Sequence, residues 1–273
     1  MCYAQRSILG SAPTRPDGPA LRIIQYCSLG SILSPLLSNV ALSVLDEHIA
    51  HGPGGPGINR LEAAKRRRRG LANYRLVRYA DDWCLAVFGT KAQAEALREE
   101  IAQVLSGMGL RLSQEKTLIT HIDEGQDFLG WRIQRHRKPG TNRHYVYTYP
   151  AKKALQAVKA KVKTLCRQVG TNQPLDTLLR QLNPVLRGWS AHFRYGVSYA
   201  TFNYLGYYTW RTVWRWLRRK HPQATWKQIR RRYCAGGWWP SSDSRELFNP
   251  VAAGTARYRY RGTIIPSPWP TTE

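Results

Sequence analysis

The chain has 273 residues, with 42 Lys and Arg against 17 Asp and Glu, which gives a formal net charge of +25 and a pI near 10.4. Hydrophobic residues make up 42% of the sequence, which excludes a wholly disordered chain and fits one large domain or two ordinary ones. A surplus of this size predicts a polyanionic partner, most commonly nucleic acid. Because the sequence shows neither a membrane-spanning apolar stretch nor a signal peptide, we expect a cytoplasmic protein with no membrane partner.

The cysteines are odd in number and far apart, and no Cys-x-x-Cys pair occurs. This spacing predicts free thiols in a reducing compartment and no structural zinc site. The five are Cys2, Cys27, Cys84, Cys166 and Cys234.

Along the chain, residues 1–25 are predicted to be an irregular leader, because several prolines and glycines interrupt them. A helix is expected over residues 31–49, with Ser34 as its N-cap and Pro35 at its first position. Its apolar face is formed by Leu36, Leu37, Val40, Leu42 and Leu45. Residues 52–57 alternate glycine and proline and are predicted to be a loop. Residues 76–88 are strand-like on both sides of Asp81-Asp82, which predicts a hairpin.

Thr90 is expected to cap a further helix that ends at the glycines 107 and 109. Its apolar face comprises Ala94, Leu97, Ile101, Val104 and Leu105. Short strands are predicted at 128–133 and 145–149, with a turn at Pro139-Gly140 between them. From residue 151 the apolar period becomes helical, and further helices are expected over 175–186 and 207–217. Residues 236–273 show no clear period.

Charge also changes along the chain. After Phe128 the acidic residues are reduced to Asp176, Asp243, Glu246 and Glu273, while Lys and Arg continue densely to Arg261. A shift of this kind is typical of a change of domain or of task.

The Asp81-Asp82 pair carries the most specific chemistry. Two adjacent carboxylates between apolar strand-like runs are costly near a core unless a cation neutralises them. Oxygen ligands suit Mg²⁺, and pairs of such ions clamp the oxygens of phosphoryl transfer in polymerases. The alternative is a surface hairpin with Asp-Asp at its turn, since Asp is common in turns.

Five blocks in a fixed order resemble the group II intron-encoded reverse transcriptase/maturase family. They are Gly30–Asn39 with its Ser-Pro-Leu-Leu-x-Asn core, Arg78-Tyr79-Ala80-Asp81-Asp82, Gly109–Thr117, Phe128–Trp131, and Leu182–Trp189 followed by Phe193. The resemblance implies an α+β fold, in which a right-hand polymerase palm with an antiparallel sheet and helices precedes an α-helical thumb/maturase domain. It places a partial palm at 26–149, the thumb at 150–235 and a basic aromatic tail at 236–273.

By the same resemblance, Asp81 and Asp82 would be catalytic ligands of Mg²⁺, or of Mn²⁺ in its place. Lys116 would lie near the phosphates of the incoming nucleotide, its alternative being an ordinary surface lysine beside Glu115. The expected partner is structured group II intron RNA, with DNA as primer or target.

The chain departs from the family pattern in two places. Relatives carry a further metal-binding Asp on an earlier palm strand, whereas here only Asp17 and Asp46 precede the pair, and neither has a strand context. Ser28-Leu29-Gly30 also replaces the family's Pro-Gln-Gly. We therefore expect an incomplete metal site, the rest of which a missing N-terminal segment or a second chain would supply.

The thumb region interleaves cations with aromatic residues, a composition that neutralises phosphates and stacks on unpaired bases. The candidate RNA-binding residues are Arg187, Arg194, Arg211, Arg215, Arg218, Arg219, Lys220, Lys227, Arg230 and Arg231, with Tyr207 and Tyr208 as stacking aromatics. The alternative assigns about half of the aromatics to the core, with Trp189 and Trp214 buried. The run 65–69 could grip RNA, be a nuclear localisation signal, or be a solvated basic loop.

Two functions follow from these patterns. The first is an RNA-directed DNA polymerase/maturase that binds intron RNA for splicing and mobility but is catalytically incomplete alone. The second is a non-catalytic RNA-binding splicing factor or a decaying remnant.

Overall fold

The computed structural model describes residues 2–7, 9–10, 34–113, 117–137, 139–235 and 237–256, and these form an α+β protein as expected. The chain divides into two compact units, one up to Leu129 and one from Gly130 onward. This division falls earlier than the predicted boundary at 149/150, because the hairpin of residues 131–150 belongs to the second unit.

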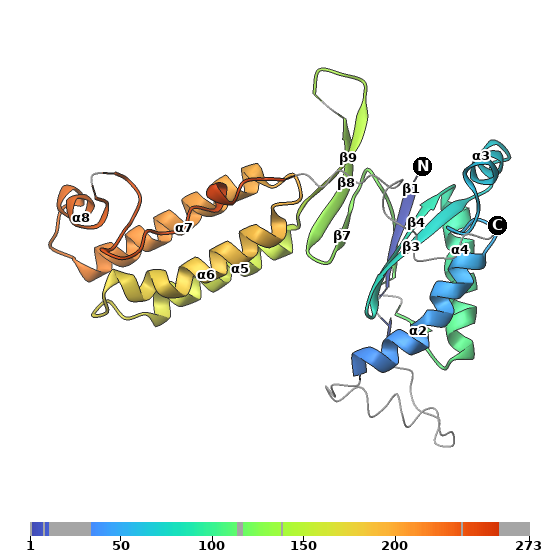
Figure 1. Cartoon of the computed structure of the whole chain (residues 1–273), viewed down its shortest axis with the longest axis horizontal. Coiled ribbons are helices and arrows are strands. Elements are labelled where there is room, and N and C mark those ends of the chain that lie inside the picture. The colour runs from blue at the N-terminus through green and yellow to red at the C-terminus, as the bar shows by residue number, and fades with distance from the viewer. Residues whose placement is uncertain are drawn as a thin grey trace. The chain divides into compact units, whose positions relative to one another are not determined.

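A four-stranded antiparallel sheet organises the first unit. Its strands are β1 (Cys2–Ser7), β3 (Asn73–Tyr79), β4 (Asp82–Phe88) and β6 (Leu118–His121), in the order β3-β4-β1-β6. The helices α2 (Ser34–His51) and α4 (Lys91–Gly107) lie on one side of it (Figure 1). The sequence β1-α2-β3-β4-α4-β6 with β1 inside the sheet is the split β-α-β arrangement of ferredoxin-like folds.

Short elements complete this unit. The strands β2 (Leu9–Gly10) and β5 (Arg111–Leu112) pair with each other, α3 spans Arg60–Arg68, and β7 spans Gln126–Phe128. Here the structure differs from two expectations. Residues 2–7 and 9–10 of the expected irregular leader are strands, because they have backbone partners far along the chain. The basic run 65–68 is helical, since Asn59 caps α3 through the amide of Glu62.

The core of the first unit lies between the sheet and the two helices. Trp83, Leu85 and Val87 alternate along β4 and point to one face, where they meet buried residues of α2 and α4. The helix residues are Leu42, Leu45 and Ile49 of α2 and Ala94, Leu97, Ile101 and Leu105 of α4. At the start of α2 the apolar residues Leu36, Leu37 and Val40 are exposed, because only the second half of the helix packs against the core.

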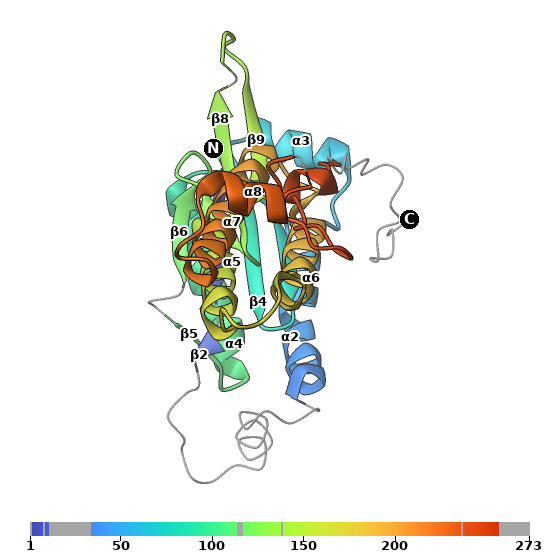
Figure 2. The same ribbon diagram turned by 90° about the vertical axis from the view of Figure 1, so that its left-hand side faces the viewer.

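The second unit begins with the hairpin β8 (Trp131–Arg137) and β9 (His144–Pro150). Three helices follow side by side, α5 (Lys152–Gln168), α6 (Leu175–Phe193) and α7 (Tyr199–Lys220) (Figures 1 and 2). The shorter α8 (Trp226–Tyr233) and the 3₁₀ turn η1 (Pro250–Ala253) complete it. No helix in the described ranges is long and apolar enough to cross a membrane.

Helices α6 and α7 are longer than predicted. The buried face of α6 continues through Leu186, Ser190 and Phe193, so the helix extends seven residues beyond the predicted end at 186. Likewise α7 begins earlier because Phe202 and Leu205 are fully buried. Burial of these side chains in the unit's core outweighs the weak local helix signals.

Candidate active site and nucleic-acid interface

The tip of the β3–β4 hairpin carries the paired carboxylates. Tyr79 pairs with Asp82, so Ala80 and Asp81 alone form the connection between the strands. Ala80 has a φ of +53°, a left-handed conformation that is uncommon for a residue with a side chain. Such backbone strain, of order 1–3 kcal/mol, concentrates at functional sites and persists only where neighbouring groups hold it in place.

Arg78 supplies that support. Its Nη1 donates to the carbonyl oxygen of Ala80 at 3.0 Å and to Oδ1 of Asn39 at 2.7 Å. Its Nε donates to both carboxylate oxygens of Asp46 at 3.0 Å, and Nη2 donates to Oδ2 at 2.5 Å. The guanidinium therefore ties the strained turn to α2, through Asn39 of the Ser-Pro-Leu-Leu-x-Asn block.

Asp81 is exposed and Asp82 is half-buried. Neither side chain has a hydrogen-bond or ion-pair partner within the described part of the chain, so both carboxylates are open to an external ligand. Strand β1, which lies next to β4, contains no acidic residue. Asp46, the nearest alternative in sequence, is occupied by Arg78.

The described residues therefore do not fit a two-metal site. No group of three His, Cys, Asp or Glu side chains able to hold a metal ion occurs among them. Two carboxylates at the end of one hairpin supply few ligands for two ions, so a two-metal site needs a further carboxylate from a neighbouring strand. The candidate Lys116 lies outside the described residues.

In the second unit, cations greatly outnumber acids. Between Gly130 and Ala256 the sequence has three acidic residues, Asp176, Asp243 and Glu246. Asp176 is engaged by Arg245, whose Nη1 donates to both of its carboxylate oxygens at 2.8 and 2.7 Å. Within the described part of the unit, the three acidic residues are too few to pair with the remaining positive charge.

Three exposed cations lie on one stripe of α7. Arg211, Arg215 and Arg218 are spaced by four and three residues, which places them on one helix face. All three are exposed, and none makes a hydrogen bond or ion pair in the part of the chain that the structure describes. Tyr207, 56% exposed, continues the stripe one turn earlier. These four residues are called the α7 stripe below.

Four other residues that were predicted to contact RNA make hydrogen bonds within their own unit. Arg219 donates to the carbonyl oxygen of Cys166, and Lys220 donates to those of Thr171 and Gln173, so both hold the end of α5 and the loop after it. Arg230 donates to the carbonyl oxygen of Gly237. Tyr208 is half-buried and donates to the carbonyl oxygen of Lys159.

The last two α8 candidates, Lys227 and Arg231, are exposed, as is Arg187 on α6. The guanidinium of Arg194 lies 5.8 Å from the ring of Tyr195. Two aromatic residues were expected in the core. Trp214 is buried there, and Trp189 is partly buried and packs against the core cluster.

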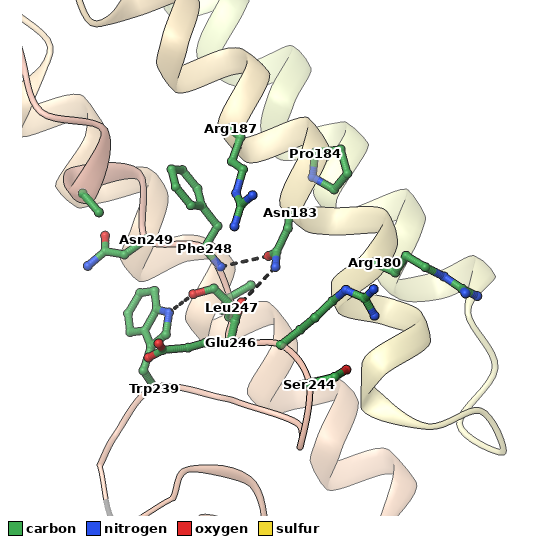
Figure 3. Close-up of a pocket in the computed structure, with 12 residues that line it drawn as sticks. Arg180, Asn183, Pro184, Arg187, Trp239, Ser244, Glu246, Leu247, Phe248 and Asn249 are labelled. Atoms are coloured by element: carbon green, nitrogen blue, oxygen red, sulfur yellow. Dashed lines mark hydrogen bonds between the residues drawn. The ribbon is translucent and has the colours of Figure 1, made fainter.

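The Leu-Asn-Pro block has a structural role that the sequence did not reveal. Asn183 donates through Nδ2 to the carbonyl oxygen of Glu246 and accepts at Oδ1 from the amide of Phe248, both at 2.8 Å (Figure 3). This clamp places Leu247 in the core, where it is 1% exposed. The pocket beside it has a volume of about 850 Å³, and Arg187 reaches from α6 to within 5.3 Å of the Phe248 ring.

Asp176 also holds the segment that contains Leu247. Hydrogen bonds from Ser244 and from Arg245 keep the pKa of the Asp176 carboxyl below its ordinary value. Burial in the same unit raises the pKa of the Cys166 thiol to about 12, so this cysteine is an inert core residue, as expected for a free structural thiol.

Each unit matches a known protein family. Residues 20–133 match the reverse transcriptase (RNA-dependent DNA polymerase) family, and residues 155–234 match the group II intron maturase-specific domain. The structure thus belongs to the class of proteins that join a reverse transcriptase palm to a maturase domain.

Relatives give the same assignment. The chain is 39% identical over 139 residues to protein YkfC of Escherichia coli, which covers 46% of this chain and 36% of that protein. It is 34% identical over 106 residues to the group II intron-encoded protein LtrA of Lactococcus lactis, which covers 38% of this chain and 16% of that protein. It is 27% identical over 138 residues to a putative COX1/OXI3 intron 1 protein of Saccharomyces cerevisiae, which also covers 38% of this chain and 16% of that protein. The chain belongs to the group II intron-encoded reverse transcriptase/maturase family, and it spans about a third of the length of the first of these relatives and about a sixth of each of the other two.

Proposed function

We propose that the chain binds the structured RNA of a group II intron through the cationic surface of its second unit, in support of intron splicing and mobility. The observation that carries this proposal is the α7 stripe, in which Arg211, Arg215 and Arg218 are exposed and have no partner among the residues that the structure describes. Cations arranged in this way are suited to the phosphates of an RNA backbone, and each contact releases condensed counterions.

We further propose that RNA-directed DNA synthesis, the reaction of this family, requires a carboxylate from outside the described residues. Reverse transcriptases in general need a divalent metal, and Asp81 and Asp82 would contribute to holding Mg²⁺ or Mn²⁺ once another segment or a second chain completes the site. The second candidate function is a non-catalytic splicing factor or a remnant, which the lack of an acid on β1 favours.

The salt dependence of RNA binding tests the main proposal. Replacing Arg211, Arg215 and Arg218 together by Ala is expected to weaken binding to intron RNA and to flatten the slope of log affinity against log salt by about two or more, since each lost phosphate contact removes about 0.7–0.9. A matched control removes the same charge from the first unit, by replacing Lys91, Arg98 and Arg111 by Ala, and is expected to leave the slope nearly unchanged. An unaltered slope in the α7 variant would contradict the proposal.

A further inference from the structure

A continuous row of aromatic rings extends sideways from the α7 stripe. Tyr207 stacks on Trp210 at a centroid distance of 6.1 Å and an interplanar angle of 21°. Trp210 and Trp214 both contact Trp226 of α8, with Trp214 and Trp226 stacked at 4.0 Å, and Trp226 lies 6.1 Å from Trp238. The row thus joins α7, α8 and the segment after α8.

Core packing does not account for the ends of this row. Trp214 is 3% exposed and belongs to the core, but Trp226, Trp238 and Tyr207 are 41%, 54% and 56% exposed. Large exposed rings that lie together are typical of a binding surface.

These rings are held in place. The indole N–H of Trp210 donates to the carbonyl oxygen of Trp238 at 2.7 Å. Arg230 donates to the carbonyl oxygen of Gly237, and its guanidinium lies 3.9 Å from the centre of the Trp238 ring. One side of that ring is therefore covered by a cation while more than half of its surface remains open. A ring that is already fixed loses little entropy when a ligand stacks on it.

A pocket of about 330 Å³ opens beside the row. Its walls include Tyr207, Trp210, Trp238 and Trp239, and two amides, Asn203 and Asn249, complete it. Asn249 accepts at Oδ1 from the amide of Val251, which leaves its Nδ2 as a donor, while Asn203 has no partner within the described residues. Gly206 lies at the base, where an added Cβ would meet Oδ1 of Asn249 at 3.3 Å.

We infer that this pocket binds one unpaired nucleobase of the RNA, stacked between aromatic side chains and read at its edge by the two amides. The inference rests on the proposed function and gives it a specific subsite. Planar walls suit a base, and amides supply both donors and acceptors to its edge. Arg230, which lies against the Trp238 ring, and Arg211, which follows Trp210 in the sequence, suit the adjoining phosphates. None of the described residues that line the pocket is acidic, which suits a polyanionic ligand.

Binding of short RNAs to the full chain tests the inference. The probes are a single-stranded oligouridylate of about 12 nucleotides, the same backbone without bases, and a duplex of equal length. Replacing Trp238 by Ala is expected to weaken oligouridylate binding about 5–150-fold, with an unchanged salt slope and no change for the abasic strand or the duplex. Trp238→Phe, which keeps a ring, should restore most of the affinity.

Tyr199→Ala provides the control, because Tyr199 is an equally exposed aromatic on α7, at 63%, outside the pocket. Equal binding of oligouridylate by the wild type and the Trp238→Ala variant, or an equal loss for the abasic strand, would overturn the base pocket and point to a protein partner or to backbone contact alone. Failure of the wild type to bind any RNA would instead overturn the proposed function itself.

Discussion

At the scale of single residues, Arg78 stabilises the conformation of the hairpin tip. Arg78→Ala would leave Asp46 without its counter-ion, with both side chains about one-sixth exposed at 15% and 17%. We expect the first unit to lose about 3 kcal/mol, the lower end of the range for a broken buried ion pair, since some contact with water remains. Hydrogen exchange read separately for each unit measures this loss. Arg75→Ala, at an exposed arginine of the same strand, should change stability by less than about 0.5 kcal/mol.

The same tip allows a direct test of catalysis. Because no third carboxylate among the described residues joins Asp81 and Asp82 in a metal-binding group, we expect the purified chain to give no primer extension on an RNA template with Mg²⁺ or Mn²⁺. The matched variant Asp81→Ala/Asp82→Ala should be indistinguishable from the wild type. Robust extension that disappears in this variant would show that the site is complete in this chain.

At the scale of elements, α7 carries two kinds of cation: some are exposed to solvent, and others donate hydrogen bonds to the backbone of the same unit. Arg219 and Lys220 satisfy backbone carbonyl oxygens of residues 166, 171 and 173. Replacing both by Ala is expected to lower the melting temperature, because those carbonyl groups lose charge-assisted hydrogen bonds. Calorimetry on this variant and on Arg215→Ala/Arg218→Ala, which removes the same charge, measures the difference. Equal melting temperatures in the two variants would contradict the assignment.

The segment that follows α8 is held to α6 by hydrogen bonds to Asp176, and we expect this contact to depend on pH. The pKa of Asp176 is lowered in the folded state, so its contacts stabilise the segment at any pH above the carboxyl's ordinary value of 3.8 and are lost as the pH falls through the depressed value. We expect the amides of residues 242–248 to lose protection from hydrogen exchange in that acidic window. Asp176→Asn should weaken their protection at neutral pH and remove its dependence on acid.

The sequence predicted well the elements that local signals define. The β3–β4 hairpin follows from its strand-like runs, and α4 follows from Thr90, which forms a capping box with Gln93, and from its apolar spacing. Contacts that join distant positions were not predictable. Arg78 meets Asn39 and Asp46 across 39 and 32 residues, and Asn183 meets Glu246 across 63. A single sequence contains no local pattern for such pairs, and the pairing of β1 was missed for the same reason.

Considered as a whole molecule, the chain exposes an apolar surface in its first unit. Leu36, Leu37, Val40 and Val44 of α2 are between 36% and 63% exposed. Contiguous apolar surface of this kind promotes association, so we expect concentration-dependent self-association in analytical ultracentrifugation. Val40→Lys/Val44→Glu, which adds no net charge, should reduce it. A monodisperse monomer at high concentration would count against this expectation.

The network around Arg78 has a consequence for how the family signature evolves. Asp81 and Asp82 have no partner within the described residues, so a lineage released from DNA synthesis could lose both without harm to folding. Arg78 and Asp46 would remain under selection for as long as the palm must fold. Relatives that have replaced the two carboxylates but kept Arg78 and Asp46 would therefore be lineages in which the former polymerase palm is kept for its folded structure alone.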